Sequence, residues 1–142
     1  MIDSFNPPGI WSPFGAFSMG VVQGDGRPVY LKGQVALDQD GQIIGQDDMK
    51  AQVRKVLENV QAVLDYVGGQ LGDIVSLTQY VTDIRAFMEA SEVRQEFFVP
   101  PFPVTTTVEV SSLYDPRLMV EITAIAEIPW ARFRHPSGNQ DS

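Results

Sequence analysis

One carboxylate in this chain stands where carboxylates are uncommon. Glu121 lies in a run that alternates as a strand, with Met119, Val120 and Ile122 around it. A carboxylate is rarely found among apolar side chains unless it is paired or takes part in chemistry. A glutamate held in such surroundings can act as an acid or a base near neutral pH. The alternative is a glutamate on an exposed sheet face or in an interface salt bridge.

Two further segments carry groups that could bind a small molecule. A run of three threonines enters a predicted strand, and its first and last members, Thr105 and Thr107, share one face. Residues 32–34 read Lys-Gly-Gln inside an apolar strand, where Gly33 would let a ligand approach backbone N–H groups closely. The alternatives are the ordinary β-propensity of threonine and a β-bulge at the glycine.

The composition excludes several kinds of chemistry. The 142 residues include no cysteine and one histidine, His135. Disulfides, thiolate nucleophiles, iron–sulfur clusters, histidine-based triads and multi-histidine metal sites are therefore excluded, and we predict no metal. With 18 acidic and 10 basic residues the net charge is −8. Such a chain repels phosphate backbones, so we expect no nucleic-acid partner.

Length and hydropathy place the chain in a common class. At 142 residues, 44% of them hydrophobic and 20% charged, it is long enough for one domain with a packed core. We expect one domain over 1–142, with a core of about 15–128, an irregular lead-in of 1–14 and a tail of 129–142. Trp130 can anchor this tail, and we expect residues 136–142 to be frayed. The first residues carry neither a basic region nor a long apolar run, so we expect a cytoplasmic protein without membrane contact.

Periodicity predicts two helices. Apolar residues repeat with helical spacing over residues 48–67, where an aspartate can cap the start and a glycine pair can end the helix. The apolar stripe comprises Val53, Val56, Leu57, Val60, Val63, Leu64 and Val67. A second helix is predicted over about 84–98, before two prolines that must end it.

Alternation and β-branched residues predict the strands. They lie at 17–22, 28–31, 34–37, 74–82, 105–110 and 118–127. The turn at Gly24-Asp25-Gly26 predicts a hairpin between the first two strands. The element order indicates an α+β fold, with a sheet of about six strands and two helices packed on one face. So short a chain cannot cover the other sheet face, which argues for an oligomer.

These motifs, in their order and spacing, resemble the Rid family, also called the YjgF or endoribonuclease L-PSP family. The resemblance begins at 32–35, continues through Gln52–Asn59 and Asp83–Phe87, and closes with Phe102–Val110 and Val120–Ala126. It covers about residues 15–128. It implies a chorismate-mutase-like fold with a mixed β-sheet, and a homotrimer with a cleft at each subunit boundary.

The resemblance also implies a chemistry. Members of this family hydrolyse reactive enamines and imines, such as 2-aminoacrylate, and release ammonia and a keto acid without a cofactor. By this resemblance Glu121 is the catalytic residue that positions the water. The substrate-binding residues that it implies are Gly33, Lys32, Thr105, Thr107 and Phe17.

The sequence departs from the family pattern at the position of an arginine that binds the substrate carboxylate. Thr105 stands there and carries no charge, so it cannot form the bidentate pair. Lys32 occupies a position that is usually serine, and we hypothesise that Lys32 restores an anion site or forms a Schiff base with a carbonyl ligand. Arg117 is a second candidate cation. The alternatives are a solvent-facing lysine and a solvated turn arginine.

Three functions follow from this pattern. The first is a Rid-type small-molecule hydrolase or deaminase with an altered substrate, which binds a small anion in a cleft between subunits. The second is a non-catalytic trimer of the same fold that binds a metabolite or has a regulatory role, which the missing arginine favours. The third is an endoribonuclease or translation inhibitor, which the acidity of the chain and the lack of a pocket histidine disfavour.

Overall fold

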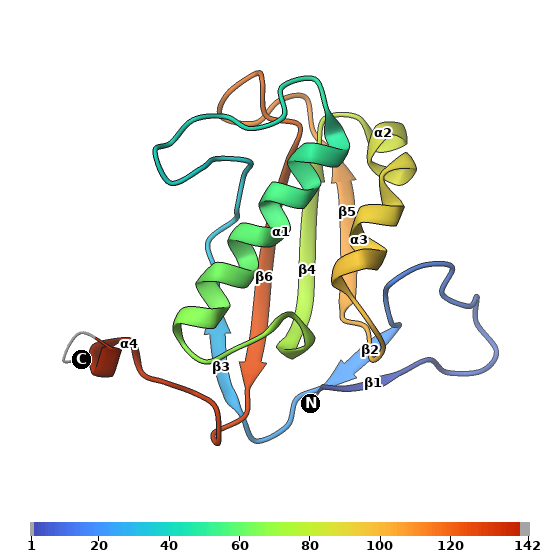
Figure 1. Ribbon diagram of the computed structural model, residues 1–142. Coiled ribbons are helices and arrows are strands. Elements are labelled where there is room, and N and C mark those ends of the chain that lie inside the picture. Colours follow the sequence, from blue (N-terminus) through green and yellow to red (C-terminus); the bar gives the residue numbers. More distant parts are fainter. Residues whose placement is uncertain (1, 140–142) are drawn as a thin grey trace.

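The computed structural model describes residues 2–139 and shows an α+β fold with two sheets (Figure 1). The larger sheet has the strand order β3-β6-β4-β5, formed by Arg27–Tyr30, Val120–Ile128, Ile74–Val81 and Val104–Glu109. In it β6 runs antiparallel to both neighbours, while β4 and β5 are parallel, so the sheet is mixed. A smaller sheet pairs β1 (Asp3–Phe5) with β2 (Gly20–Val22).

Three helices cover one face of the larger sheet, as Figure 1 shows. They are α1 (Met49–Tyr66), α2 (Ile84–Glu89) and α3 (Ser91–Phe97). The predicted start of the first helix is confirmed, because the Asp48 carboxylate accepts a hydrogen bond from the Ala51 N–H at 3.1 Å. A 3-10 turn, η1 (Leu71–Asp73), and a short α4 (Pro136–Asn139) complete the described residues. No helix within residues 2–139 is long and apolar enough to cross a membrane.

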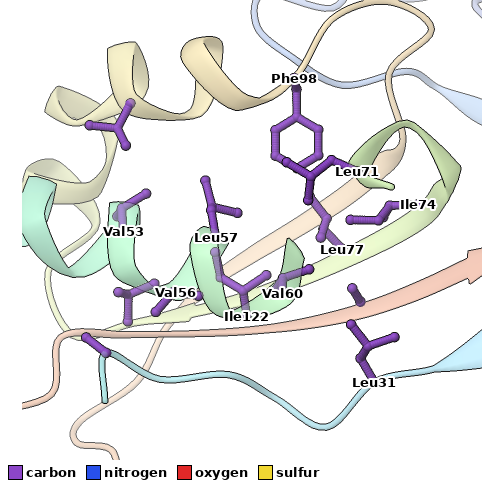
Figure 2. Packing of buried hydrophobic residues seen from close by; sticks show 14 of the residues in the cluster. Leu31, Val53, Val56, Leu57, Val60, Leu71, Ile74, Leu77, Phe98 and Ile122 are labelled. Atoms are coloured by element: carbon purple, nitrogen blue, oxygen red, sulfur yellow. The ribbon is translucent and has the colours of Figure 1, made fainter. Parts of the chain in front are cut away.

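The core lies between α1 and the sheet (Figure 2). The helix contributes its predicted stripe, and Leu77 and Ile122 meet it from β4 and β6. Each such side chain contributes about 1.5–3 kcal/mol when it is fully buried. Val63 is an exception to the predicted stripe, because it is exposed beside the segment 32–39. The alternation predicted for the last strand is confirmed, since Val120 and every second residue after it are buried.

The predicted hairpin between 17–22 and 28–31 is wrong. The first of these segments pairs with β1 and the second with β6. Gly24 and Gly26, which lie between the two segments, do not form a tight turn. They let the backbone approach β6 closely. Gly24 donates its N–H to Glu127 at 2.8 Å, and a Cβ on Gly26 would lie 2.7 Å from the carbonyl oxygen of Ile128. The chain therefore crosses the end of β6 before it joins the sheet.

Other expectations need smaller corrections. The helix-bearing sheet has four strands rather than about six, because β1 and β2 pair with each other and 34–37 forms only isolated bridges. The second helix is divided into α2 and α3 at Ala90, whose N–H bonds to two carbonyls. The lead-in contains a strand, and residues 136–139, expected to be frayed, form a helical turn. The rest of that expectation, at 140–142, lies outside the described residues.

Candidate functional site

A cavity of about 350 Å³ lies between the lead-in, α2, α3 and the helix-facing side of β4 and β5. This volume is in the range of small-molecule binding sites. Aromatic and apolar side chains form most of its wall, namely Trp11, Phe14, Phe17, Leu77, Phe87, Met88 and Phe98. Its polar side chains are Gln79, Ser91, Arg94, Gln95, Thr105 and Thr107. The sequence predictions of Thr105, Thr107 and Phe17 thus fall in one cavity.

Three aromatic rings, two from the lead-in and one from Phe17 just after it, form one wall of this cavity. Trp11 stacks on Phe14 with ring centroids 5.9 Å apart, and Phe14 meets Phe17 edge-on at 5.1 Å. Trp11 and Phe14 remain 61% and 75% exposed, so they do not serve as core anchors. The backbone of the segment is held by a hydrogen bond from Ser18 N–H to the carbonyl of Pro103 at 2.9 Å. The lead-in is thereby positioned over the cavity.

The floor of the cavity is built by the parallel pair β4 and β5. Leu77 lies opposite Thr105 and Gln79 opposite Thr107, so all four side chains share the helix-facing side. Gln79 is buried and donates a hydrogen bond from Nε2 to Thr107 Oγ1 at 2.8 Å. Gln79 was not among the site residues predicted from the sequence. The signal that could have found it is a glutamine among strand positions whose other buried members, Ile74, Leu77 and Val81, are apolar.

Arg94 is a second cavity residue that the sequence analysis missed. Its guanidinium carbon lies 3.9 Å from the centroid of the Phe87 ring, and Nη1 donates to the Phe87 carbonyl at 3.0 Å. Burial lowers the pKa of Arg94 to about 10, which leaves the side chain charged at neutral pH. The spacing of Phe87, Ser91, Arg94 and Phe98 places all four on one helical face, and that spacing was the available signal.

Gly33 and Glu121 meet outside this cavity. Glu121 alternates with buried neighbours on β6 and is half-buried on the sheet face that carries no helix. A Cβ on Gly33 would collide with its carboxylate. Asn59 of α1 holds the glycine segment by donating hydrogen bonds to the carbonyls of Val35 at 3.1 Å and Leu37 at 2.9 Å. The helix therefore positions the backbone that packs against Glu121.

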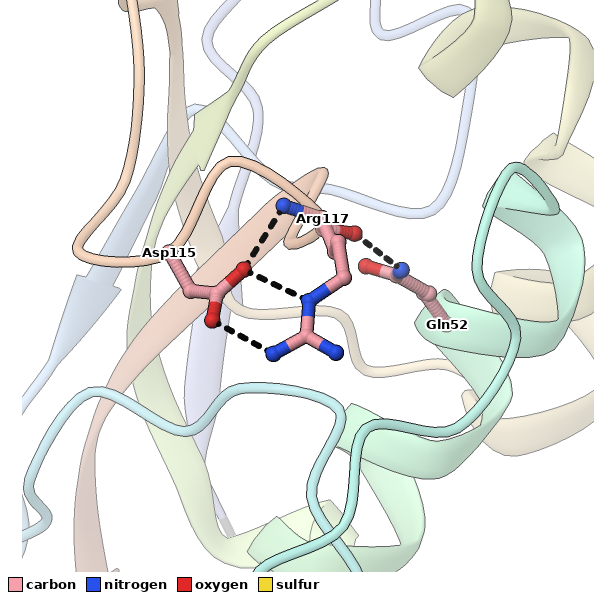
Figure 3. Close-up of polar contacts among 3 residues, drawn as sticks. All are labelled: Gln52, Asp115 and Arg117. Carbon is pink, nitrogen blue, oxygen red and sulfur yellow. Dashed lines mark hydrogen bonds and ion pairs between the residues drawn. The ribbon is translucent and has the colours of Figure 1, made fainter.

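The two cations proposed to replace the family arginine lie elsewhere. Lys32 is exposed in a groove between residues 32–39 and α1, and it does not line the cavity of Thr105. Arg117 forms a bidentate pair with Asp115, at 3.0 and 2.8 Å, in an exposed turn (Figure 3). Its guanidinium holds the pKa of the Asp115 carboxyl down at about 2. Arg94 is the only lysine or arginine of residues 2–139 that lines the cavity.

Gln52 connects this turn to α1, as Figure 3 shows in part. It is fully buried, and its Nε2 donates to the carbonyls of Arg117 at 2.8 Å and Gly45 at 3.2 Å. Its Oε1 accepts the N–H of Met119 at 2.8 Å. A single side chain thus satisfies three backbone groups: one at Gly45, before α1, and two at Arg117 and Met119, just before β6.

The tail after β6 packs on the far end of α1. Arg132 binds Asp73 through two hydrogen bonds, of 2.9 and 2.6 Å, and donates to the Gly68 carbonyl at 3.0 Å. Asp73 raises the pKa of Arg132. Trp130, expected to be able to anchor the tail, is largely exposed, and Arg27 lies 5.6 Å from its ring. No tail residue among 129–139 lines the cavity.

Within one chain the predicted site residues form two groups on opposite sides of the sheet. Phe17, Thr105 and Thr107 line the cavity on the helix side, whereas Glu121 belongs to the other side. The structure thus separates the candidate acid or base from the candidate binding cavity. No group of three or more metal-ligating side chains is found among residues 2–139.

Residues 10–128 match the family described as Endoribonuclease L-PSP. A RutC family protein of Saccharolobus solfataricus is 38% identical over 117 residues, which cover 81% of this chain and 89% of that protein. The Rid-family protein YyfB of Yersinia pestis superposes with a TM-score of 0.81 at 30% identity, over 89% of this chain and 98% of that one. RidA of an Antarctic Psychrobacter gives a TM-score of 0.66 at 30% identity, over 82% and 92%.

Proposed function

Because this chain belongs to the endoribonuclease L-PSP family, which includes the Rid and YjgF proteins, we propose that it is a small-molecule deaminase or hydrolase. Its substrate would be an enamine, an imine or a related metabolite. The observation that carries the proposal is the cavity on the helix side of β4 and β5, which has an aromatic wall, a polar floor and a cation. A protein with a purely structural role would fill such a space with its own side chains.

In the proposed mechanism Glu121 positions and activates a water molecule for addition to a C=N bond. Gly33 gives the carboxylate its place, because its lack of a side chain leaves room there. Thr105 and Thr107 would hydrogen-bond the substrate, and Phe17 would exclude water from one side. The carbinolamine that forms by water addition loses ammonia to leave a carbonyl product.

The separation of these groups within one chain supports a site shared between subunits. The open sheet face carries Glu121 together with apolar side chains such as Tyr30, which is 76% exposed. For the proposed mechanism, a second copy that covers this face would have to supply its own cavity residues to Glu121. We therefore propose a homotrimer as the active form, as the family resemblance implies. Analytical ultracentrifugation of the wild type tests it, and a monomer at micromolar concentration would contradict it.

The activity is tested with freshly generated 2-aminoacrylate and 2-iminobutanoate, by measuring release of ammonia and of the keto acid. We expect Glu121→Gln to lower kcat/KM at least about 100-fold, in the range of a lost general base. Glu58→Gln, which neutralises an exposed carboxylate on α1, is the matched control and should retain wild-type rates. Equal rates for wild type and Glu121→Gln would refute the proposed role of Glu121.

A second candidate function is a binding protein of the same fold without catalysis. Thr105 favours it, because the threonine supplies no charge where the family pattern has an arginine. Thr105→Arg distinguishes the two functions. An inactive wild type with an active Thr105→Arg variant would show that the scaffold is intact and that the natural ligand is not one of these imines, which favours the binding protein.

A further inference from the structure

We propose that Arg94 is the anion-binding residue of the cavity and that the cavity takes carboxylates which also carry an aromatic ring. The proposal deepens the proposed function, since it assigns the substrate class of the same cavity. It assigns the anion site to α3, away from both cations considered in the sequence analysis. Three observations lead to it: the partners of Arg94, its fixed orientation and the composition of the opposite wall.

The first observation is that Arg94 is charged and half-buried, and that no acidic side chain of the described part of the chain pairs with it. Among residues 2–139 the ion pairs join Lys50 to Glu92, Arg54 to Glu96, Arg117 to Asp115 and Arg132 to Asp73, and none includes Arg94. A guanidinium has five N–H donors, and within residues 2–139 Arg94 uses one of them, in the hydrogen bond to the Phe87 carbonyl. A cation removed from water in this way is stabilised by an anion that enters the cavity.

The second observation is that the guanidinium is held in one orientation. It lies 3.9 Å from the centre of the Phe87 ring, and that ring is 1% exposed. Stacking on a buried ring and the hydrogen bond to the same residue fix the plane of the group. A planar, fixed guanidinium is suited to bidentate binding of a carboxylate at little entropic cost. A flexible lysine such as Lys32 offers no such geometry.

The third observation concerns the wall formed by the lead-in. Trp11, Phe14 and Phe17 contact one another and line the same cavity as Arg94. Their rings offer faces and edges on which a ligand ring can stack. A carboxylate of two or three carbons would leave these rings uncovered. A ligand with an acidic end at Arg94 and an aromatic end at the lead-in would contact both walls.

The test measures binding by isothermal titration calorimetry with 3-phenylpropanoate as the probe. Two matched ligands separate the contributions: 3-phenylpropanamide has the same shape without the charge, and propanoate has the charge without the ring. We expect wild type to bind 3-phenylpropanoate at least 10-fold more tightly than either of them. Equal affinity for the amide overturns the anion site, and equal affinity for propanoate overturns the aromatic specificity.

Two variants test whether Arg94 is the residue that binds the carboxylate of 3-phenylpropanoate. Arg94→Gln should weaken binding of 3-phenylpropanoate at least 20-fold and leave binding of the amide within 2-fold. Arg85→Gln removes an exposed arginine of α2 outside the cavity and should bind all three ligands as wild type does. An Arg94→Gln variant with wild-type affinity would overturn the proposal. If that variant does not fold, the comparison of the three ligands on wild type still decides it.

These outcomes are separate from those of the proposed function. None of the three ligands contains a C=N bond, so binding is measured without turnover. Binding of 3-phenylpropanoate through Arg94 by a protein inactive on imines would uphold the inference while the proposed deaminase fails. Hydrolysis of small imines by a protein that does not bind 3-phenylpropanoate would uphold the proposed deaminase and overturn the assignment of Arg94 as the anion-binding residue.

Discussion

Gly33 and Glu121 lie so close together that no side chain fits between them. A Cβ on Gly33 would collide with Oε2 of Glu121 and lie 3.0 Å from its carboxyl carbon. The neighbouring residues fix this contact, because Gln34 and Ile122 exchange two backbone hydrogen bonds of 2.8 and 3.0 Å. The missing side chain at position 33 therefore determines where the Glu121 carboxylate can lie.

We expect Gly33→Ala to displace the Glu121 carboxylate and reduce imine hydrolysis about 10-fold or more, because misplaced catalytic groups lose rate steeply. The displaced atoms are the end of a flexible side chain, so the fold should survive. Gly72→Ala is the control, since a Cβ there meets only one atom, at 3.9 Å. Unchanged kcat/KM in Gly33→Ala would contradict the assigned position.

Gln52→Met should destabilise the protein by about 2–4 kcal/mol. The substitution keeps the volume but leaves three backbone groups without their partner, at about 1–3 kcal/mol for each that water cannot reach. Urea unfolding measures the change. Gln52→Glu keeps the acceptor for Met119 N–H and loses the donors, so it separates the two halves of the contact. A loss below about 0.5 kcal/mol for Gln52→Met would show that water or relaxation replaces these bonds.

Arg132→Met should cost about 2–4 kcal/mol, because it leaves the Asp73 carboxylate, 1% exposed, without its cation. The Gln70 N–H, at 2.9 Å, still binds Asp73 and limits the loss. Arg54→Met is the matched control, since its pair with Glu96 lies in solvent and should contribute little. Equal urea midpoints for Arg132→Met and the control would contradict the structural role of the tail.

Arg117→Gln should lower stability only at pH values where Asp115 is ionised. The pKa of Asp115 is held at about 2 in the folded protein, against an ordinary value near 3.9 when unfolded. A lowered folded pKa contributes stability above about pH 4, and this contribution is lost as the pH falls toward 2. The difference in urea midpoint between wild type and variant should therefore shrink from pH 6 to pH 2. A difference independent of pH would contradict the pairing.

The long elements could be predicted from the sequence because several signals agree in each. In α1 the apolar stripe, the cap Asp48 and the following glycines all indicate the same bounds. The strand in the lead-in, β1, could not be predicted, since it has three residues and shows no periodicity. The break between α2 and α3 at Ala90 also leaves no signal in the sequence. Alanine is the best helix former, and the Ala90 N–H keeps its hydrogen bonds to the carbonyls of Ala86 and Phe87.

The site was predictable only in part, for a physical reason. Threonines and glycines can be placed from strand spacing, which is how Thr105 and Thr107 were paired on one face. The spacing places Arg94 on one helical face with Phe87, but spacing does not distinguish a buried arginine from one that faces solvent. Only tertiary packing places this one against Phe87. Lys32 and Arg117, the cations proposed to replace the missing arginine, are near the predicted motifs in sequence but do not line the cavity.

The two tryptophans of the chain give it two separate optical reporters. Trp11 belongs to the cavity wall, and Trp130 lies on the tail beside Arg27 and Phe133. In a Trp130→Phe variant the emission would follow ligand entry alone. In a Trp11→Phe variant it would follow detachment of the tail. Stopped-flow fluorescence could thus time both events in the same protein without an added dye.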